Sequence, residues 1–460
     1  MMEFTPYKIF TEFSTNKISR TSAIEQLITI IENSNDYKIR IECIRILGKI
    51  EKTIENSEST RDIIFNLFEN LLISDTNERI RNAAAIILKE NFLERALSPM
   101  KWALMHDDSP LCLETIFQSL IEIIRNIKKK SERLSKLILI QEIKKIEEKD
   151  FKIGFEILTD KKNAHDFTVK ELAEILINYY AITFLKKIIW RLKYSIINCK
   201  VVELDFIFKG LTKLPEAIKY FDSLKVLILR YNQLTFLPDW ISSLKDLETF
   251  NLNVNNINTL PDSIGSLTSL KELLLWKNEI QYLPESFGAL SSLNNLNLRL
   301  NQLLYLPERF GELSKLKDLN LHDNKLTYLP ESFSSLNSLE NLNLSWNSLE
   351  CLPNSIGSLS SLKMLDLERN ELINIPKSIG DLISLEILNI GDNRLNQIPN
   401  SIGNLKSLKI LNISKNYLTE LPTTLGSLNL LEELYINDNL IKMIPKELKI
   451  LEQNGLKIFF

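Results

Sequence analysis

Every 23 residues between Val201 and Pro445, the chain repeats the pattern of the stretch Leu316-Lys317-Asp318-Leu319-Asn320-Leu321-His322-Asp323-Asn324-Lys325-Leu326. The complete unit reads L-x-x-L-x-L-x-x-N-x-L-x-x-L-P-x-x-I/F-G-x-L-x-x. Its L-x-L core alternates with a period of two, so one face of a short strand points inward and the other outward. Because one coil cannot bury its own leucines, the repeat predicts stacked coils whose strands pair in parallel, about 4.8 Å apart.

Three residue types keep this period without an insertion or deletion. Eleven of the 14 prolines lie on it: Pro215, Pro238, Pro261, Pro284, Pro307, Pro330, Pro353, Pro376, Pro399, Pro422 and Pro445. Seven of the 12 glycines do the same: Gly265, Gly288, Gly311, Gly357, Gly380, Gly403 and Gly426. An asparagine recurs in ten successive units: Asn232, Asn255, Asn278, Asn301, Asn324, Asn347, Asn370, Asn393, Asn416 and Asn439. Because proline fixes its own φ angle and disfavours helix at the residue before it, each L-P pair predicts an extended bend.

The unit resembles the leucine-rich repeat, and its L-P-x-x-I-G-x-L ending resembles the Ras-group subfamily of Ras-signalling scaffolds and disease-resistance-like proteins. This resemblance covers residues 201–460 and implies an α/β solenoid of 11 repeats of 23 residues plus a C-terminal cap, with parallel strands on its concave face. In that family the asparagine side chain bonds backbone groups of neighbouring coils, which implies a structural ladder from Asn232 to Asn439. The first coil departs from the pattern, with Lys209 at the asparagine position. Residues 456–460 are expected to form a last strand over the open end.

Residues 1–200 lack this period and carry apolar residues at helical spacing. Two similar stretches place Arg40 and Arg81 at equivalent positions, 41 residues apart. Their form, I-R-x-x-A/C-x-x-x-L, resembles the inner helix of HEAT repeats and implies a HEAT-like, all-α domain over residues 1–150, with a weaker third copy from Asp108 to Ile123. We expect helix pairs at residues 21–32 with 36–51, 58–73 with 76–90, and 92–105 with 108–127.

The segments after these repeats are expected to join the two halves. Residues 131–149 predict one charged amphipathic helix, and residues 151–200 predict a helical connector and N-terminal cap for the solenoid. The region from Val169 to Tyr194 is apolar, aromatic and basic together. We interpret it as the cap, with a membrane-surface helix as the alternative because lysines 186 and 187 cluster with arginine 191 at one end.

Composition excludes several classes of protein. Lysine and arginine number 56 against 59 aspartates and glutamates, for a net charge of −3, so bulk attraction to nucleic acid or anionic membrane is not expected. No apolar run reaches the roughly 18 residues of a membrane span, and the first residues lack the pattern of a signal peptide. The four cysteines form no C-x-x-C pair, which suits a reducing compartment. We therefore expect a cytoplasmic protein.

Catalytic motifs are missing from the sequence. It contains no phosphate-binding glycine loop, nucleophile elbow or zinc-protease motif. The cluster His106-Asp107-Asp108 predicts a helix-joining loop with Asp108 as the N-cap, in preference to a metal or acid–base site. We therefore expect no enzyme activity, cofactor, metal or small-molecule substrate.

The outward positions of the strands are the third, fifth, seventh and eighth of the unit, and they form the candidate binding surface. Tryptophan and arginine near the centre of a surface are typical of binding hot spots. The candidate protein-binding residues on the concave face are Arg230, Tyr231, Trp276, Arg299, His322, Asp323, Trp346, Glu368 and Arg369. Two structural alternatives compete with binding: a cross-strand ion-pair ladder at the eighth position and a sheet-stabilising amide ladder at the fifth.

These observations predict a non-enzymatic scaffold that binds a protein partner on its concave face. The Ras-group resemblance implies a small GTPase or signalling component as the partner. The alternative is a targeting or regulatory subunit of a phosphatase, kinase or ligase complex, and a catalytic protein resembling HEAT-like lyases is a third, weaker alternative.

Overall fold

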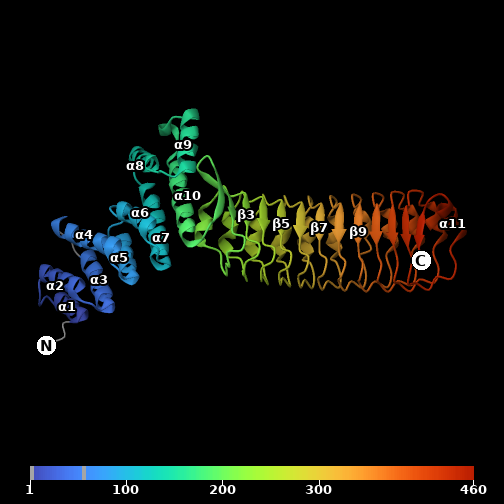
Figure 1. Ribbon diagram of the computed structural model, residues 1–460, viewed down its shortest axis with the longest axis horizontal. Coiled ribbons are helices and arrows are strands. Elements are labelled where there is room, and N and C mark those ends of the chain that lie inside the picture. The colour runs from blue at the N-terminus through green and yellow to red at the C-terminus, as the bar shows by residue number, and fades with distance from the viewer. Residues whose placement is uncertain (1–4, 54–57) are drawn as a thin grey trace. The chain divides into compact units, whose positions relative to one another are not determined.

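The computed structural model describes residues 5–53 and 58–460, apart from the side chain of His165. The chain divides into two compact units: one holds the residues up to Leu192 with Ile196–Lys200, and the other holds Lys193–Ser195 with Val201–Phe460. The first unit is helical and the second is built on a largely parallel sheet (Figure 1). The expected fold class, an all-α region followed by an α/β solenoid, is confirmed.

The helical unit is a succession of helices joined by short turns. They are α1 (Pro6–Ser14), α2 (Arg20–Asn33), α3 (Tyr37–Lys52), α4 (Glu58–Ser74), α5 (Glu78–Asn91), α6 (Leu97–His106), α7 (Pro110–Ile127), α8 (Glu132–Lys144), α9 (Lys149–Lys161), η1 (Ala164–Asp166) and α10 (Val169–Ile188). Consecutive helices pack in pairs, α2 on α3, α4 on α5 and α6 on α7, and α3, α5 and α7 stack in chain order. Each helix buries the apolar stripe set by its 3.6-residue period, as Cys43, Leu47 and Ile50 show in α3.

The expected helix pairs are present, with two differences in detail. Residues 92–96 form a turn, so α6 begins only at Leu97. The N-cap of α7 is Ser109, whose hydroxyl accepts the Cys112 amide, and not Asp108 as predicted. Asp108 instead lies one residue outside the helix, where its carboxylate pairs with Lys187.

The end of the helical unit differs more from the prediction. The single helix expected over residues 131–149 is two helices, because α8 ends at Lys144 and α9 begins at Lys149. Helix α10 lies in the region expected to form the connector and N-terminal cap. It starts in a capping box of Thr168 and Glu171 and packs against α7 and α8, so it completes the helical unit. No helix within residues 5–53 or 58–460 is long and apolar enough to cross a membrane.

The second unit is a solenoid. Its strands lie in chain order in one 13-stranded sheet of the described residues: β1 (Lys193–Ile197), β2 (Lys200–Asp205), β3 (Val226–Ile228), β4 (Thr249–Asn251), β5 (Glu272–Leu274), β6 (Asn295–Asn297), β7 (Asp318–Asn320), β8 (Asn341–Asn343), β9 (Met364–Asp366), β10 (Ile387–Asn389), β11 (Ile410–Asn412), β12 (Glu433–Tyr435) and β13 (Lys457–Phe459). From β2 to β12 each residue pairs in parallel with the residue 23 positions later, as in Leu319↔Leu342. The last pair is offset by 24, since Glu433 faces Lys457, so the expected final strand is present.

Short helices form the opposite side of each coil. They are η2 (Glu216–Tyr220), η3 (Asp239–Ser243), η4 (Asp262–Ser266), η5 (Glu285–Ala289), η6 (Glu308–Glu312), η7 (Glu331–Ser335), η8 (Ile356–Ser358), η9 (Lys377–Asp381), η10 (Asn400–Asn404), η11 (Thr423–Ser427) and the α-helix α11 (Lys446–Gln453). The repeated leucines fill the space between strands and helices, and Leu319, Leu321 and Leu326 are at most 2% exposed. We number the coils 1 to 11 from Val201 and the positions within each coil from 1 to 23.

The turn after each strand uses an unusual backbone conformation. At position 8 of coils 2–11 the φ angle lies between 51° and 59°, in the left-handed region, although none of these residues is glycine. This conformation costs an ordinary residue roughly 1–2 kcal/mol, and even the β-branched Val254 adopts it. Four candidate binding residues share it: Tyr231, Asp323, Trp346 and Arg369.

Candidate protein-binding surface

The asparagines at position 9 join every coil to the one before it. In coil 6, the Asn324 amide donates to the carbonyls of Leu298 and Leu321, both at 3.0 Å, and its Oδ1 accepts the Leu303 amide at 3.0 Å. Each of the ten asparagines makes the same three kinds of bond, from Asn232 to Asn439. Nine of these side chains, from Asn232 to Asn416, are at most 9% exposed, so their bonds satisfy backbone groups that water cannot reach, while Asn439 in the last coil is only partly buried.

The amides at position 5 act differently from the ladder expected for them. The Oδ1 of Asn320 accepts the backbone amide of His322 in its own coil, at 3.0 Å, and Asn343 accepts that of Ser345 at 2.9 Å. The same bond occurs at every carboxamide or carboxylate of this position from Asn251 to Asn412. These bonds therefore end the strand of each single coil. A bridge between coils at this position is made by Asn389, whose Nδ2 donates to Glu368 Oε2 of the preceding coil at 3.4 Å.

Three of the candidate binding residues meet in the middle of the strand face, which we define as the outward side of β2–β13. The Arg369 guanidinium lies over the Trp346 ring, 3.9 Å from its centroid, and the His322 ring meets the same indole edge-on at 6.2 Å. Asp392 holds Arg369 from the other side, with Nε and Oδ2 3.0 Å apart. Trp346 is 46% exposed although it contacts both the Arg369 guanidinium and the His322 ring, so the cluster presents an aromatic surface to solvent.

Hydrogen bonds orient the histidine of this cluster. The hydroxyl of Ser345 donates to Asn343 Oδ1 at 2.6 Å and lies 2.8 Å from His322 Nδ1. Since the serine proton is used, Nδ1 carries the imidazole hydrogen and donates to the serine oxygen, which leaves Nε2 as an acceptor. Burial, followed by the positive charge of Arg299, lowers the pKa of His322 below its usual value. Both effects favour the neutral form of the ring.

The other candidate residues lie apart from this cluster. Tyr231 stacks on Phe208 with ring centroids 4.4 Å apart, and Arg230 lies 5.8 Å from the Tyr231 ring. Trp276 is partly buried, and its Nε1 makes no hydrogen bond within the described residues. Among those residues, no side-chain hydrogen bond, ion pair or ring contact joins Arg230, Tyr231 or Trp276 to Trp346.

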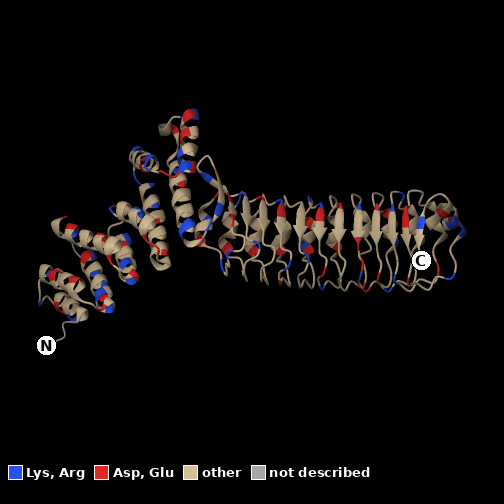
Figure 2. Ribbon diagram, viewed as in Figure 1, with Lys and Arg blue, Asp and Glu red and all other residues tan. Residues whose placement is uncertain are grey.

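A ladder of ion pairs exists, but at position 2 and not at position 8. At position 8 the structure has the pair of Arg369 and Asp392. At position 2, lysine and glutamate alternate from coil to coil, with Asn294 in place of one glutamate: Lys225, Glu248, Lys271, Asn294, Lys317, Glu340, Lys363, Glu386, Lys409 and Glu432. Glu248 bridges two lysines at 2.8 and 2.6 Å, and Glu340 bridges two at 3.3 and 2.7 Å. Both signs of charge are accordingly interspersed along the solenoid (Figure 2).

The alternation at position 2 could have been read from the sequence, because it keeps the same 23-residue period. The ladder shifts the ionisation of its carboxylates. Hydrogen bonds from Lys225 and Lys271 hold the pKa of Glu248 at about 2, and hydrogen bonds from Lys363 and Lys317 lower that of Glu340. We interpret this column as structural.

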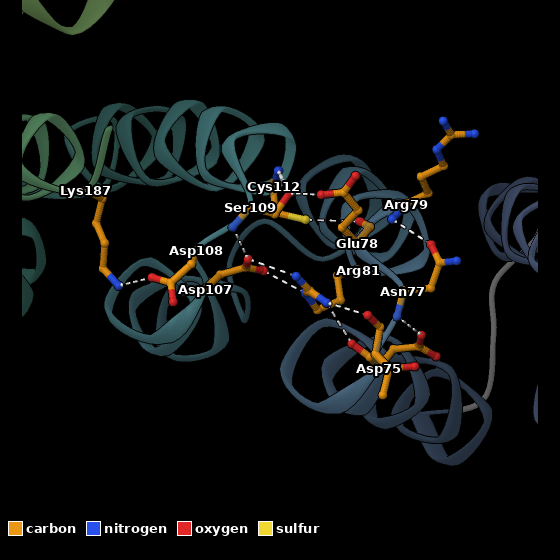
Figure 3. A network of polar contacts seen from close by, with 11 residues as sticks. Asp75, Asn77, Glu78, Arg79, Arg81, Asp107, Asp108, Ser109, Cys112 and Lys187 are labelled. Atoms are coloured by element: carbon orange, nitrogen blue, oxygen red, sulfur yellow. Dashed lines mark hydrogen bonds and ion pairs between the residues drawn. The ribbon is translucent and has the colours of Figure 1, made fainter. Parts of the chain in front are cut away.

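In the helical unit, two equivalent arginines each bond the turn that joins the two helices of the next pair. Figure 3 shows the second of them, Arg81, with Asp107. Arg40 reaches Asp75 Oδ2 at 2.5 Å, and Arg81 holds Asp107 through two bonds of 2.8 and 3.0 Å. Each aspartate also accepts a backbone amide two residues later, from Asn77 and Ser109 respectively. Burial would raise the pKa of Asp107, but the bonds from Arg81 and the Ser109 amide outweigh it, and the pKa is lowered.

The contacts of these residues account for the cluster His106-Asp107-Asp108 in structural terms. The cluster borders a hollow of about 310 Å³ that Trp102 and Arg81 also line. His106 bonds the Trp102 carbonyl through Nδ1 at 2.7 Å and stacks on the Trp102 ring at 4.2 Å. Asp107 and Asp108 are each held by a cation. In the part of the chain that the structure describes, no group of three or more histidine, cysteine or acidic side chains could hold a metal ion.

Two family profiles match the second half of the chain. The profile "Leucine rich repeat" matches residues 222–280 and 291–349, and "Leucine-rich repeat region" matches residues 345–453. No curated protein matches the chain.

Several solved structures are similar to the chain. A TDR receptor is 30% identical, with a TM-score of 0.52, over 56% of this chain and 47% of the receptor. A leucine-rich repeat protein from Leptospira interrogans is 29% identical, with a TM-score of 0.35, over 55% of this chain and 82% of that protein. The leucine-rich repeat ectodomain of the plant membrane receptor kinase GASSHO1/SCHENGEN3 from Arabidopsis thaliana is 30% identical, with a TM-score of 0.47, over 57% of this chain and 35% of that one. The chain thus spans less than half of either receptor structure.

Proposed function

Since the second half of this chain is a leucine-rich repeat solenoid, we propose that the chain is a non-enzymatic scaffold that binds a protein partner on its strand face. Leucine-rich repeats generally mediate interactions between proteins, and the TDR receptor is similar to this chain over 56% of its length. The observation that carries the proposal is the cluster of His322, Trp346 and Arg369.

The cluster has the properties of a binding hot spot. An exposed tryptophan offers a large contact area, and Arg369 is already held by Asp392 and the indole ring, so little side-chain entropy is left to lose on binding. The neutral His322 adds a hydrogen-bond acceptor in the same place. Together these groups favour a partner that offers an apolar or aromatic side chain beside a hydrogen-bond donor.

The identity of the partner follows from resemblance alone. The L-P-x-x-I-G-x-L ending of the coils resembles the Ras-group subfamily, so a small GTPase is the first class of partner to test. Arg40 and Arg81 fit HEAT-like repeats in the first half, because each joins one helix pair to the next. A cytoplasmic location fits the four cysteines, all of them free thiols.

A second candidate function is a targeting or regulatory subunit of a phosphatase, kinase or ligase complex. The observation that favours it is the division of the chain into two compact units, since each could hold a different protein. In that case, an enzyme that co-purifies with the intact chain changes its activity on binding.

The test is affinity capture with the intact chain and two matched variants. Trp346→Ala with Arg369→Glu removes the cluster, whereas Tyr417→Ala removes an aromatic ring that is 58% exposed at position 10 of another coil. We expect the double variant to lose specific partners, identified by mass spectrometry, and Tyr417→Ala to keep them. Equal recovery by both variants would exclude the strand-face cluster as the binding site.

A further inference from the structure

A second surface of the solenoid combines exposed aromatic rings with acids that make no ion pair among the described residues. At position 13, just before the L-P bend, four of the five coils from 2 to 6 carry an aromatic side chain that is 41–53% exposed: Phe236, Tyr282, Tyr305 and Tyr328. Thr259 takes this place in coil 3. The rings of Tyr282 and Tyr305 lie 5.1 Å apart, so neighbouring coils present a nearly continuous aromatic row.

An acidic row runs beside the aromatic one, three positions later in each coil. At position 16 the same coils carry an exposed carboxylate: Asp239, Asp262, Glu285, Glu308 and Glu331. In residues 5–53 and 58–460, none of these five carboxylates makes an ion pair. The contrast is with position 2, where each of Glu248, Glu340 and Glu386 is neutralised by a lysine. We call the two rows together the aromatic–acidic stripe.

Helix capping accounts for only one of the acids: the Glu285 carboxylate accepts the backbone amides of Glu308 and Arg309, at 3.3 and 3.2 Å, where the helix of the next coil begins. It does not account for the row as a whole. Position 16 is the first residue of a 3₁₀ helix, where a negative charge is favoured. Yet in coils 8–10 the same helices begin at Lys377, Asn400 and Thr423, so the fold does not require an acid there.

The aromatic row ends at the same place as the acidic one. In coils 7–10 position 13 is occupied by Cys351, Asn374, Gln397 and Glu420. Position 16 of coil 1 is also acidic, but there Glu216 pairs with Lys219. The aromatic side chains and the acids outside ion pairs therefore share one stretch of the solenoid, coils 2–6.

The two positions border a common depression. In coils 8–10, where the side chains are smaller, positions 13 and 16 line one hollow of about 670 Å³ with the prolines of the L-P bends, among them Asn374, Lys377, Gln397 and Asn400. By the repeat symmetry of the coils, the aromatic and acidic rows flank the corresponding prolines in coils 2–6.

We propose that the aromatic–acidic stripe binds an extended, arginine- or lysine-rich segment of another protein. Guanidinium and ammonium groups would pair with these carboxylates, which no cation holds among the described residues, and would stack on the tyrosine faces, since both contacts favour a cation. Five coils at about 4.8 Å spacing extend roughly 20 Å, which suits about six residues of extended chain. This surface is separate from the strand face, so the proposal does not depend on the function proposed above.

The test measures binding of a fluorescein-labelled peptide of four Arg-Ser repeats to the full chain by fluorescence polarisation. A peptide of four Glu-Ser repeats is the control for the sign of the charge. The first variant is Asp262→Asn, Glu285→Gln and Glu308→Gln, which removes three charges from the stripe. The matched variant removes three charges from the strand face: Glu272→Gln, Asp318→Asn and Asp323→Asn.

We expect the stripe variant to bind the Arg-Ser peptide at least tenfold more weakly and the strand-face variant to change less than twofold. A third variant, Tyr282→Ser with Tyr305→Ser and Tyr328→Ser, keeps every charge and is expected to weaken binding at least fivefold. The proposal is overturned if the intact chain prefers the Glu-Ser peptide or binds neither. It is also overturned if the stripe and strand-face variants weaken binding equally, because the net negative charge of the chain would then be enough to explain binding of the Arg-Ser peptide.

Discussion

Gly311 lies so close to the next coil that a Cβ atom on it would stand 2.0 Å from the carbonyl oxygen of Ser332. Five other glycines on the 23-residue period repeat this relationship, with distances from 2.1 Å for Gly288 to 2.4 Å for Gly403 to the equivalent oxygen, whereas a Cβ on Gly426 would meet the Glu447 side chain. The glycine is required by space and not by its backbone angles, because its φ is not in the left-handed region. It therefore sets how tightly the helical sides of the coils stack.

Gly311→Ala is expected to destabilise the solenoid. The new methyl group must displace backbone of the next coil, and overpacking of this kind typically costs about 1–3 kcal/mol. The matched control is Ser334→Ala, since coil 6 already carries a Cβ at the same position. Urea unfolding followed by circular dichroism measures both; equal stability of the two variants would contradict the steric explanation.

Asn324→Ala is expected to cost about 3 kcal/mol, because it leaves two buried carbonyls and the Leu303 amide without their bonds. Asn320→Ala removes one bond within a single coil and is expected to cost about 1 kcal/mol. Denaturant unfolding gives both values. If Asn320→Ala destabilised the protein as much as Asn324→Ala, the bonds between coils would contribute no more to stability than a bond within one coil.

The loss of stability caused by Glu248→Gln, measured as the difference in free energy of unfolding from the intact chain, is expected to depend on pH. In the folded protein the pKa of Glu248 is lowered to about 2 from an ordinary value near 4.5. A lowered pKa stabilises the fold at pH values above the unfolded pKa, and this stabilisation disappears as pH falls from about 4.5 to about 2. The variant should thus be less stable than the intact chain at pH 7, and this difference should shrink below pH 4.5.

The control for this measurement is Glu308→Gln, which removes an exposed carboxylate outside any ion pair among the described residues. Its effect is expected to be small and nearly constant over the same pH range. One molar salt should reduce the Glu248→Gln effect at pH 7, because exposed ion pairs are screened. An effect of Glu248→Gln that does not change with pH would refute the role of the lysine bridge.

Arg81→Ala is expected to destabilise the helical unit by about 3–5 kcal/mol, because it leaves the buried Asp107 without its cation. The control is Arg79→Ala on the same helix, which removes an exposed bond to the Tyr37 hydroxyl and is expected to cost less than about 0.5 kcal/mol. Thermal unfolding monitored at 222 nm compares the two. Similar melting temperatures for both variants would contradict a structural role for the Arg81–Asp107 pair.

Thiol labelling is expected to modify one cysteine in the native protein and four after unfolding. Cys351 is exposed, whereas burial raises the pKa of Cys43 and Cys199 to about 12 and that of Cys112 to about 11. Mass spectrometry after treatment with iodoacetamide at pH 8 counts the modified thiols. The variant Cys351→Ser should remain unlabelled under native conditions; rapid labelling of a second cysteine would show that the helical unit opens.

The sequence alone determined the features that repeat at a fixed interval. The 23-residue period predicted the parallel pairing of the strands, the stacking of the coils and the end of the array, because each coil can bury its leucines only against an equal coil in register. Helical spacing likewise located the helix pairs of the first half. Even the Lys–Glu alternation at position 2 is present in the sequence, although we did not predict it.

Only the tertiary structure decided which side chains meet. The left-handed turn at position 8 places Trp346 between His322 and Arg369, and the alternation of signs at that position had suggested a longer ladder than the one pair it forms. In the helical unit, Asp107 lies 26 residues from Arg81 and is brought to it by the packing of helices of unequal length. In a repeat, the same spacing along the sequence sets which residues pair in every coil. Contacts outside the repeat depend on how helices of different lengths pack, and no local sequence pattern predicts that packing.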